Sequence, residues 1–147
     1  MIALLQRVKS AAVSIGGECV GKIDEGLLVF LGVEKNDSQA LADKLLSRVL
    51  SYRVFADDEG KMNNSVKDHK GGLLIVSQFT LAADTRKGLR PGFSRAADPV
   101  TGEALYNYFL SQAKDLHSPV ASGRFGGDMQ VSLVNDGPVT FWLQSND

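Results

Sequence analysis

The sequence has few of the residues on which common catalytic centres depend. It contains one cysteine, Cys19, and two histidines, His69 and His117. A single cysteine excludes a disulfide within the chain and favours a reducing, cytoplasmic location. Cys19 lies in a short strand-like segment, where we expect a buried or half-buried structural thiol. Each histidine lies in a polar loop or at a helix end, so the spacing indicates neither a zinc site nor a catalytic nucleophile beside a base.

Other features that would define a function class are also missing. No apolar run is long enough to cross a bilayer. The first residues lack the basic, apolar and small-residue order of a signal peptide, so we expect none. Gly71 and Gly72 precede a strand rather than a helix, unlike a phosphate-binding loop. The acidic segment 57–60 lacks the later ligands of a calcium loop. We therefore expect no metal, no cofactor and no membrane partner.

The charge of the whole chain does not predict nucleic-acid binding, because the formal net charge is −1. Its distribution is less even. The segment 85–97 contains glycine and proline and no acidic residue, and it carries four basic side chains: Arg86, Lys87, Arg90 and Arg95. This segment is either a solvated loop or a loop that contacts phosphates, and charge alone leaves both readings open.

The hydrophobic pattern predicts an α+β protein that forms a single domain over residues 1–147. Of these residues 44% are hydrophobic, enough for a sizeable core. Alternating and continuous apolar runs predict strands at 2–8, 11–15, 18–23, 27–33, 73–76, 129–134 and 139–143. Two helices are expected, one from the N-cap Ser38 to about residue 54 and one that begins at Asp98 and Pro99. The resulting fold is a curled, mostly antiparallel sheet or barrel-like core with helices on one side.

Two polar stretches lie at the boundaries of expected strands. Residues 77–80, Ser-Gln-Phe-Thr, follow the buried strand 73–76, and residues 135–140, Asn-Asp-Gly-Pro-Val-Thr, join the last two strands. Backbone N–H groups at a strand end can hold an oxyanion without a side-chain base. Gly137 has no side chain and Pro138 no N–H, so this backbone can approach another molecule closely. Taken singly, each stretch is also compatible with an ordinary polar strand end or turn.

Together, the two stretches resemble the paired motifs of the D-aminoacyl-tRNA deacylase, or D-tyrosyl-tRNA(Tyr) deacylase, family. The resemblance extends over essentially the whole chain and includes 2–8, 31–33, 60–63, 90–91 and 123–125. One departure is Gly92, where the family pattern has serine in Arg-Pro-Ser-Phe. The resemblance implies hydrolysis of the ester between a D-amino acid and the 3′-terminal adenosine of tRNA. It also implies a homodimer with sites at the interface and a cis Gly-Pro bond that reaches into the partner's site.

Carried onto this sequence, the resemblance assigns catalytic roles to Gln78, Phe79 and Thr80, which would line the reacting carbonyl and the ribose. We expect the Phe79 and Thr80 amides to hold the developing oxyanion, while water attacks with help from the neighbouring ribose hydroxyl. Thr80 is then not an obligatory nucleophile. Basic residues of the segment 85–97 would contact phosphates of the acceptor stem; these are Arg86, Lys87, Arg90 and Arg95.

The substrate-binding residues implied by the resemblance are Ser77, Gly137, Pro138, Met129 and Arg7. Gly137 and Pro138 would exclude an L side chain by steric contact, and glycyl esters would pass because glycine has no side chain. Arg7 would orient this pair through backbone carbonyls. Met129 forms either a pocket wall or part of the core.

Two other interpretations remain open at this point. The first is a non-catalytic RNA- or nucleotide-binding homodimeric module, in which the basic segment and Phe79 support stacking. The second is a structural dimer, in which Gly137 and Pro138 form an interface turn. Comparing hydrolysis of D- and L-aminoacyl-tRNA separates the first from the enzyme. In the second, Pro138→Ala would change assembly but not the chirality of turnover.

Overall fold

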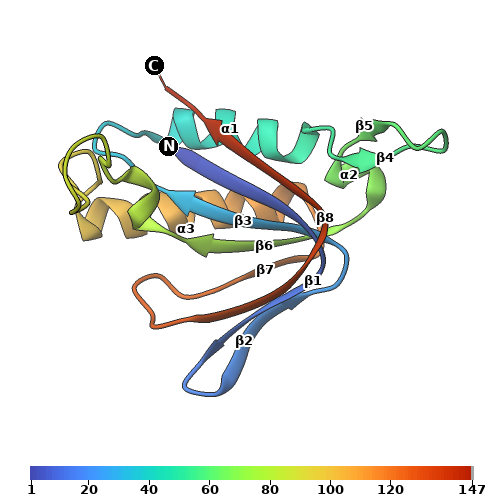
Figure 1. The fold of residues 1–147 in the computed structure, drawn as a ribbon, viewed down its shortest axis with the longest axis horizontal. Helices are drawn as coiled ribbons and strands as arrows, with labels where there is room; N and C mark the ends of the chain where they lie inside the picture. Colours follow the sequence, from blue (N-terminus) through green and yellow to red (C-terminus); the bar gives the residue numbers. More distant parts are fainter. Residues whose placement is uncertain (147) are drawn as a thin grey trace.

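The structure, a computed structural model, describes residues 1–146 (Figure 1). The strands of its main sheet are β1 (Ile2–Ile15), β2 (Glu18–Ile23), β3 (Gly26–Gly32), β6 (Gly72–Ser77), β7 (Val120–Ser122) and β8 (Gln130–Gln144). Their order is β2–β1–β3–β6–β7, and β8 also pairs with β1. The remaining elements are β4 (Phe55–Ala56), β5 (Met62–Asn64), α1 (Gln39–Ser51), α2 (Val66–His69), α3 (Pro99–Leu116) and the 3₁₀ helix η1 (Phe79–Ala82).

The predicted α+β class with a curled, barrel-like sheet is confirmed, with two differences. The sheet is mixed, because β1 pairs antiparallel with β2, β3 and β8, whereas β6 runs parallel to both β3 and β7. The described residues contain three α-helices rather than the two expected. The additional helix, α2, is one turn long and is capped reciprocally by Ser65 and Asp68. So short a helix has no hydrophobic periodicity by which a sequence could reveal it.

Two pairs of predicted strands are each one long strand. The segments 2–8 and 11–15 merge into β1, and 129–134 and 139–143 merge into β8. β1 and β8 pair along their length and curve together through the lower half of Figure 1. The segment that contains Gly137 and Pro138 is therefore not a turn between strands but an irregularity inside β8.

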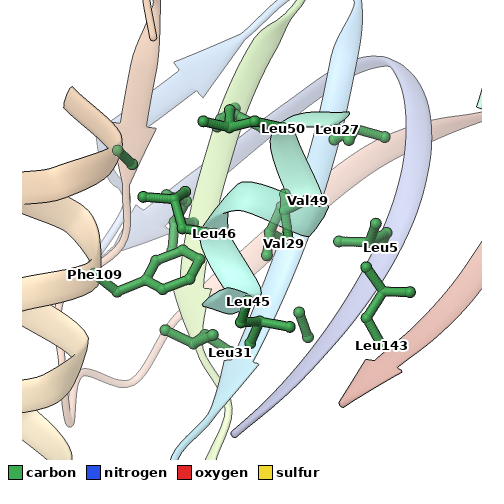
Figure 2. Close-up of a cluster of buried hydrophobic side chains, with 14 of the residues drawn as sticks. Leu5, Leu27, Val29, Leu31, Leu45, Leu46, Val49, Leu50, Phe109 and Leu143 are labelled. Atoms are coloured by element: carbon green, nitrogen blue, oxygen red, sulfur yellow. The ribbon is translucent and has the colours of Figure 1, made fainter. Parts of the chain in front are cut away.

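The main core lies between the sheet and the two long helices, as Figure 2 shows for part of it. The predicted N-caps are confirmed: Ser38 accepts a hydrogen bond from the Leu41 amide and Asp98 from the Thr101 amide. The buried side chains of α1 pack against residues from alternate positions of β3, namely Leu27, Val29 and Leu31. The intervening Leu28 belongs to a second apolar cluster on the opposite face. β3 is therefore covered on both faces, as its continuous apolar run indicates.

Two further features complete the fold. Cys19 is exposed in β2, so the expectation of a buried or half-buried thiol is wrong. None of the helices in residues 1–146 is long and apolar enough to cross a membrane.

Candidate active site

A pocket of about 520 Å³ opens where the parallel strands β3 and β6 end. Ser77 is the last residue of β6 and pairs with Leu31, whose carbonyl accepts a 2.8 Å hydrogen bond from the Gln78 amide. The chain then turns into η1. The pocket is lined by residues of several elements: Phe30, Leu31, Val33, Val76, Ser77, Gln78, Phe79, Ala97, Pro99, Gly102, Tyr106, Phe125, Gly126, Gly127, Met129 and Val131. The structure thus places Ser77, Gln78, Phe79 and Met129 in one cavity.

The backbone of η1 leaves two hydrogen-bond donors unused. The Leu81 amide donates to the Gln78 carbonyl at 3.2 Å, and the Ala83 amide donates to the Thr80 carbonyl at 3.1 Å. Within residues 1–146, the amides of Phe79 and Thr80 donate to no backbone carbonyl. The first amides of a helix have no partner in their own helix, so these two are available to a ligand oxygen.

The side chains of this segment supply no conventional base. Among the described residues that line the pocket, none is a histidine or a carboxylate. The Gln78 side-chain amide donates to the Thr80 hydroxyl oxygen, so a glutamine rather than a base is next to that hydroxyl. The arrangement can stabilise a developing negative charge through N–H groups, but it offers no side chain that would deprotonate a nucleophile.

The far wall of the pocket is aromatic and neutral. The Tyr106 hydroxyl donates to the Ile75 carbonyl at 2.8 Å, and burial raises the pKa of Tyr106 to about 12. Its ring lies 6.0 Å from that of Phe125, which packs over Gly102 of α3. The sequence reasoning missed Tyr106 and Gly102, although the residues 123–125 already belonged to the resemblance. These two positions are buried because of the rotation of α3 about its own axis, which only the packed structure shows.

Met129 both lines the pocket and packs against the second apolar cluster, so its two predicted positions are compatible. A Cβ atom at Gly123 would lie 2.5 Å from the Met129 sulfur. The absence of a side chain at Gly123 thus leaves room for the Met129 thioether beside the backbone of residue 123.

Gly137 and Pro138 lie elsewhere, in a bulge of β8. Gln6 pairs with Thr140 and Val8 with Asn135, so Arg7 alone on β1 faces the segment 136–139 on β8. Such an insertion makes the longer strand bulge out of the sheet. Both residues of the pair are exposed, the peptide bond between them is cis, and neither lines the pocket.

Arg7 holds the base of this bulge. Its Nε donates to the Asp136 carbonyl at 3.1 Å, and its Nη1 donates to the Val54 carbonyl at 2.7 Å. The Asp136 carboxylate lies 3.4 Å from Arg7 Nε and 3.7 Å from Lys9 Nζ. The residue before Gly137 is therefore fixed through both its backbone and its side chain.

The structure separates the two motifs within one chain. Arg7 pairs with Leu27 on β3, whereas Ser77 pairs with Leu31. Four residues along a strand correspond to about 13 Å. The bulge and the pocket are therefore two separate features of one chain.

The basic segment is less uniform than its sequence indicates. Arg86 pairs with Asp84 through contacts of 2.9 and 2.6 Å, and this hydrogen-bonded guanidinium holds the pKa of the Asp84 carboxyl well below its usual range. Arg95 donates to the Ala83 carbonyl at 3.5 Å. Lys87 and Arg90 are exposed, and neither forms an ion pair within the described residues. The sequence reasoning missed Asp84 because it lies just before the segment whose charges were counted.

Comparison with known proteins adds the decisive observation. The family model described as D-Tyr-tRNA(Tyr) deacylase matches residues 4–144. The chain belongs to this family. A D-aminoacyl-tRNA deacylase of Stutzerimonas stutzeri (strain A1501) is 66% identical over 145 residues, which cover 99% of this chain and 100% of the relative. The D-aminoacyl-tRNA deacylase of Pseudomonas fluorescens (strain Pf0-1) is 65% identical over the same length.

Solved structures agree with the deacylase-family fold. A protein described as c-Myc DNA unwinding element binding protein superposes with a TM-score of 0.95 at 40% identity, and the match covers 100% of both chains. A probable eukaryotic D-amino acid tRNA deacylase superposes with a TM-score of 0.86 over 97% of both chains. At 16% identity the latter shows the fold alone.

Proposed function

We propose that this chain hydrolyses the ester bond between a D-amino acid and the 3′-terminal adenosine of tRNA, as a chiral proofreading step. As a member of its family, the chain is a hydrolase of aminoacyl-tRNA esters. The observation that carries the proposal is the position of the resemblance motif, because Ser77, Gln78 and Phe79 line the pocket, although Thr80 does not. Within residues 1–146 the amides of Phe79 and Thr80 donate to no backbone carbonyl. We assign this activity to a single domain, residues 1–147, in the cytoplasm.

The chemistry needs no side-chain nucleophile. Water attacks the ester carbonyl carbon, and the neighbouring ribose hydroxyl assists it. The carbonyl oxygen becomes an oxyanion that accepts hydrogen bonds from the Phe79 and Thr80 amides. The bond to the ribose oxygen then breaks, that oxygen takes a proton, and the free D-amino acid leaves. Gln78 and Thr80 line this centre.

Chirality is set by exclusion. In the proposed homodimer, the exposed Gly137–Pro138 bulge of one copy enters the pocket of the other and faces the substrate's α-carbon. An L side chain would collide with that backbone, a D side chain would point away, and a glycyl ester would pass. A filter of this kind makes no favourable contact to the side chain, so the enzyme accepts many D-amino acids.

The direct test compares hydrolysis of D- and L-aminoacyl-tRNA by the purified protein. We expect release of the D-amino acid at enzyme rates and release of the L-amino acid near the uncatalysed rate. Binding of tRNA without hydrolysis of either ester would favour the non-catalytic RNA-binding module. Cleavage of both esters at the same rate would remove the chiral role.

We predict that Lys87→Ala and Arg90→Ala each weaken tRNA binding and make it less dependent on salt. If each side chain meets one phosphate, the slope of log affinity against log salt should fall by about 0.7–0.9 per residue. The paired variant Asp84→Asn/Arg86→Gln removes opposite charges that already neutralise each other, so we expect its slope to stay near the wild-type value. The measurement is tRNA affinity at several salt concentrations, and equal slopes for all variants would contradict the assignment of Lys87 and Arg90.

We also predict that Gly32→Ala damages catalysis. A Cβ atom at Gly32 would lie 2.9 Å from the Leu81 Cβ and 3.1 Å from the Gln78 carbonyl oxygen, so η1 would have to shift. Misplacing a catalytic group by about 1 Å can reduce the rate by about 100-fold. We therefore expect a large loss of kcat/KM for D-aminoacyl-tRNA.

Gly92→Ala is the matched control for this prediction. A Cβ atom there would lie 3.8 Å from the Asp84 carbonyl oxygen, an ordinary contact. Its activity should stay close to that of the wild type, with both variants checked by thermal unfolding. A folded Gly32→Ala protein with full activity would show that η1 does not position the reacting groups.

A further inference from the structure

Two phenylalanine rings form an exposed platform at the mouth of the pocket. Phe79 is 60% exposed and Phe93 is 40% exposed, and their ring centroids lie 5.2 Å apart at an interplanar angle of 41°. Phe79 lines the pocket, whereas Phe93 does not. The aromatic surface therefore continues from the pocket outward. An exposed aromatic surface that continues outward from a pocket is a candidate binding surface.

The backbone that carries Phe93 is held at several points. The Asp84 amide donates to the Gly92 carbonyl at 2.7 Å, and the Gly92 amide donates back to the Asp84 carbonyl at 3.0 Å. On the other side of Phe93, the Ala96 amide donates to the Phe93 carbonyl at 3.1 Å and the Ala97 amide to the Val33 carbonyl at 3.0 Å. A ring on a fixed backbone has fewer conformations to lose on binding, so a ligand that stacks on it meets a smaller entropic cost.

Charge indicates which ligand fits the platform. Lys87, Arg90 and Arg95 lie in the same loop and are exposed. The nearby acid in the loop, Asp84, is already paired with Arg86. Aromatic faces beside cationic side chains are the combination that binds unpaired nucleotides, because the bases stack while the cations meet the phosphates.

We propose that Phe93, together with Phe79, is a stacking platform for the unpaired base that precedes the terminal adenosine of the tRNA. This proposal rests on the proposed function, since the terminal adenosine must enter the pocket beside Phe79. The pocket then binds the aminoacyl-adenosine, and the platform binds the base of the nucleotide that precedes this adenosine. Phe93 gives the enzyme affinity for the single-stranded end of the RNA and has no part in the chemistry.

The test compares three D-tyrosyl esters of increasing length: those of adenosine, of the trinucleotide CCA and of whole tRNA. Stacking of one base on an aromatic side chain corresponds to a factor of about 5 to 150 in affinity. We expect Phe93→Leu to lower kcat/KM at least about fivefold for the CCA and tRNA esters. The adenosine ester should be cleaved at the wild-type rate, which also shows that the variant is folded. Phe93→Tyr keeps an aromatic ring, so this variant should cleave the longer esters at the wild-type rate.

The control variant is Leu116→Ala, which trims another exposed apolar side chain, at the end of α3. It should leave all three rates unchanged. Equal losses on all three esters in Phe93→Leu would overturn the proposal, because Phe93 would then act on the catalytic segment through Phe79. Unchanged rates in Phe93→Leu on all three would overturn it as well. A wild-type protein that cleaves none of the D-tyrosyl esters would instead overturn the proposed function and this platform together.

Discussion

Thr80→Pro is expected to lower kcat/KM for D-aminoacyl-tRNA by about 100- to 1,000-fold, which is the cost of removing one oxyanion donor. Proline removes the backbone N–H, and it also disfavours the helical conformation of Phe79, the first residue of η1, so both effects lower the rate. Because the Thr80 amide donates to no backbone carbonyl in residues 1–146, this change breaks no internal backbone hydrogen bond. Thr80→Ala keeps the N–H and removes only the hydroxyl. We expect it to retain activity within about tenfold of the wild type, since no base activates that hydroxyl.

Single-turnover hydrolysis of D-aminoacyl-tRNA measures both variants, and thermal unfolding with a tRNA-binding assay shows whether each still folds and binds. The difference between proline and alanine at one position separates the backbone from the side chain. If Thr80→Ala is as inactive as Thr80→Pro while it still binds substrate, the hydroxyl is the nucleophile and the proposed chemistry is wrong.

Gly137→Ala is expected to lower the ratio of D- to L-ester hydrolysis by about 100-fold, because the steric gate moves away from the substrate. Gly137 has φ +129°, a conformation that L side chains rarely adopt. An added Cβ would also lie 2.8 Å from Val139 Cγ2 and 3.4 Å from Arg7 Nη2. The bulge must rearrange, and its contact to the α-carbon of a substrate is lost.

The control for this prediction is Gly60→Ala. Gly60 also has positive φ, at +78°, but no atom lies within 4 Å of its Cβ position, so only the conformational strain is shared. Its D-to-L ratio should equal that of the wild type. A Gly137→Ala protein that changes its oligomeric state but keeps its D-to-L ratio would favour the interface-turn interpretation.

Mixing Gly137→Ala with Thr80→Pro subunits tests whether the gate acts between copies. In a mixed dimer, one pocket combines an intact residue 80 with an intact residue 137 from the partner, and the other pocket has both defects. About a quarter of the sites in an equal mixture should then be both active and D-specific, which follows from the symmetry of a two-fold interface. A further quarter, in the Gly137→Ala homodimers, should hydrolyse esters without the gate. No recovery of D-specific hydrolysis after subunit exchange would show that the two motifs act within one chain.

The local features of the sequence predicted much of the fold. The N-caps at Ser38 and Asp98 and the buried strand 73–76 depend on neighbours a few positions away. All three are found in the structure, where the strand is one residue longer at each end. The continuous apolar run of β3 likewise predicted its burial on both faces. The α2 turn was missed because four residues are too few for a periodic pattern.

The predicted site residues are divided by the fold rather than gathered by it. Gln78 and Phe79 meet Met129 in the pocket, whereas Gly137 and Arg7 lie at the bulge. The sequence held no signal for this separation, because a resemblance names residues without placing them in space. The same limit applies to Tyr106, whose burial depends on how α3 rests on the sheet.

The sequence by itself determined the family and the two motifs, because both are written in short runs of residues. Only the tertiary structure decided that residues 136–139 are a bulge within β8 and that, within residues 1–146, the Phe79 and Thr80 amides donate to no backbone carbonyl. The reason is physical: these properties depend on partners far along the chain. The hydrogen bond that fixes Asp136 comes from Arg7, 129 positions away, and the strand that β6 ends beside is β3. Pairings at such distances are set by the sheet as a whole and leave no local pattern.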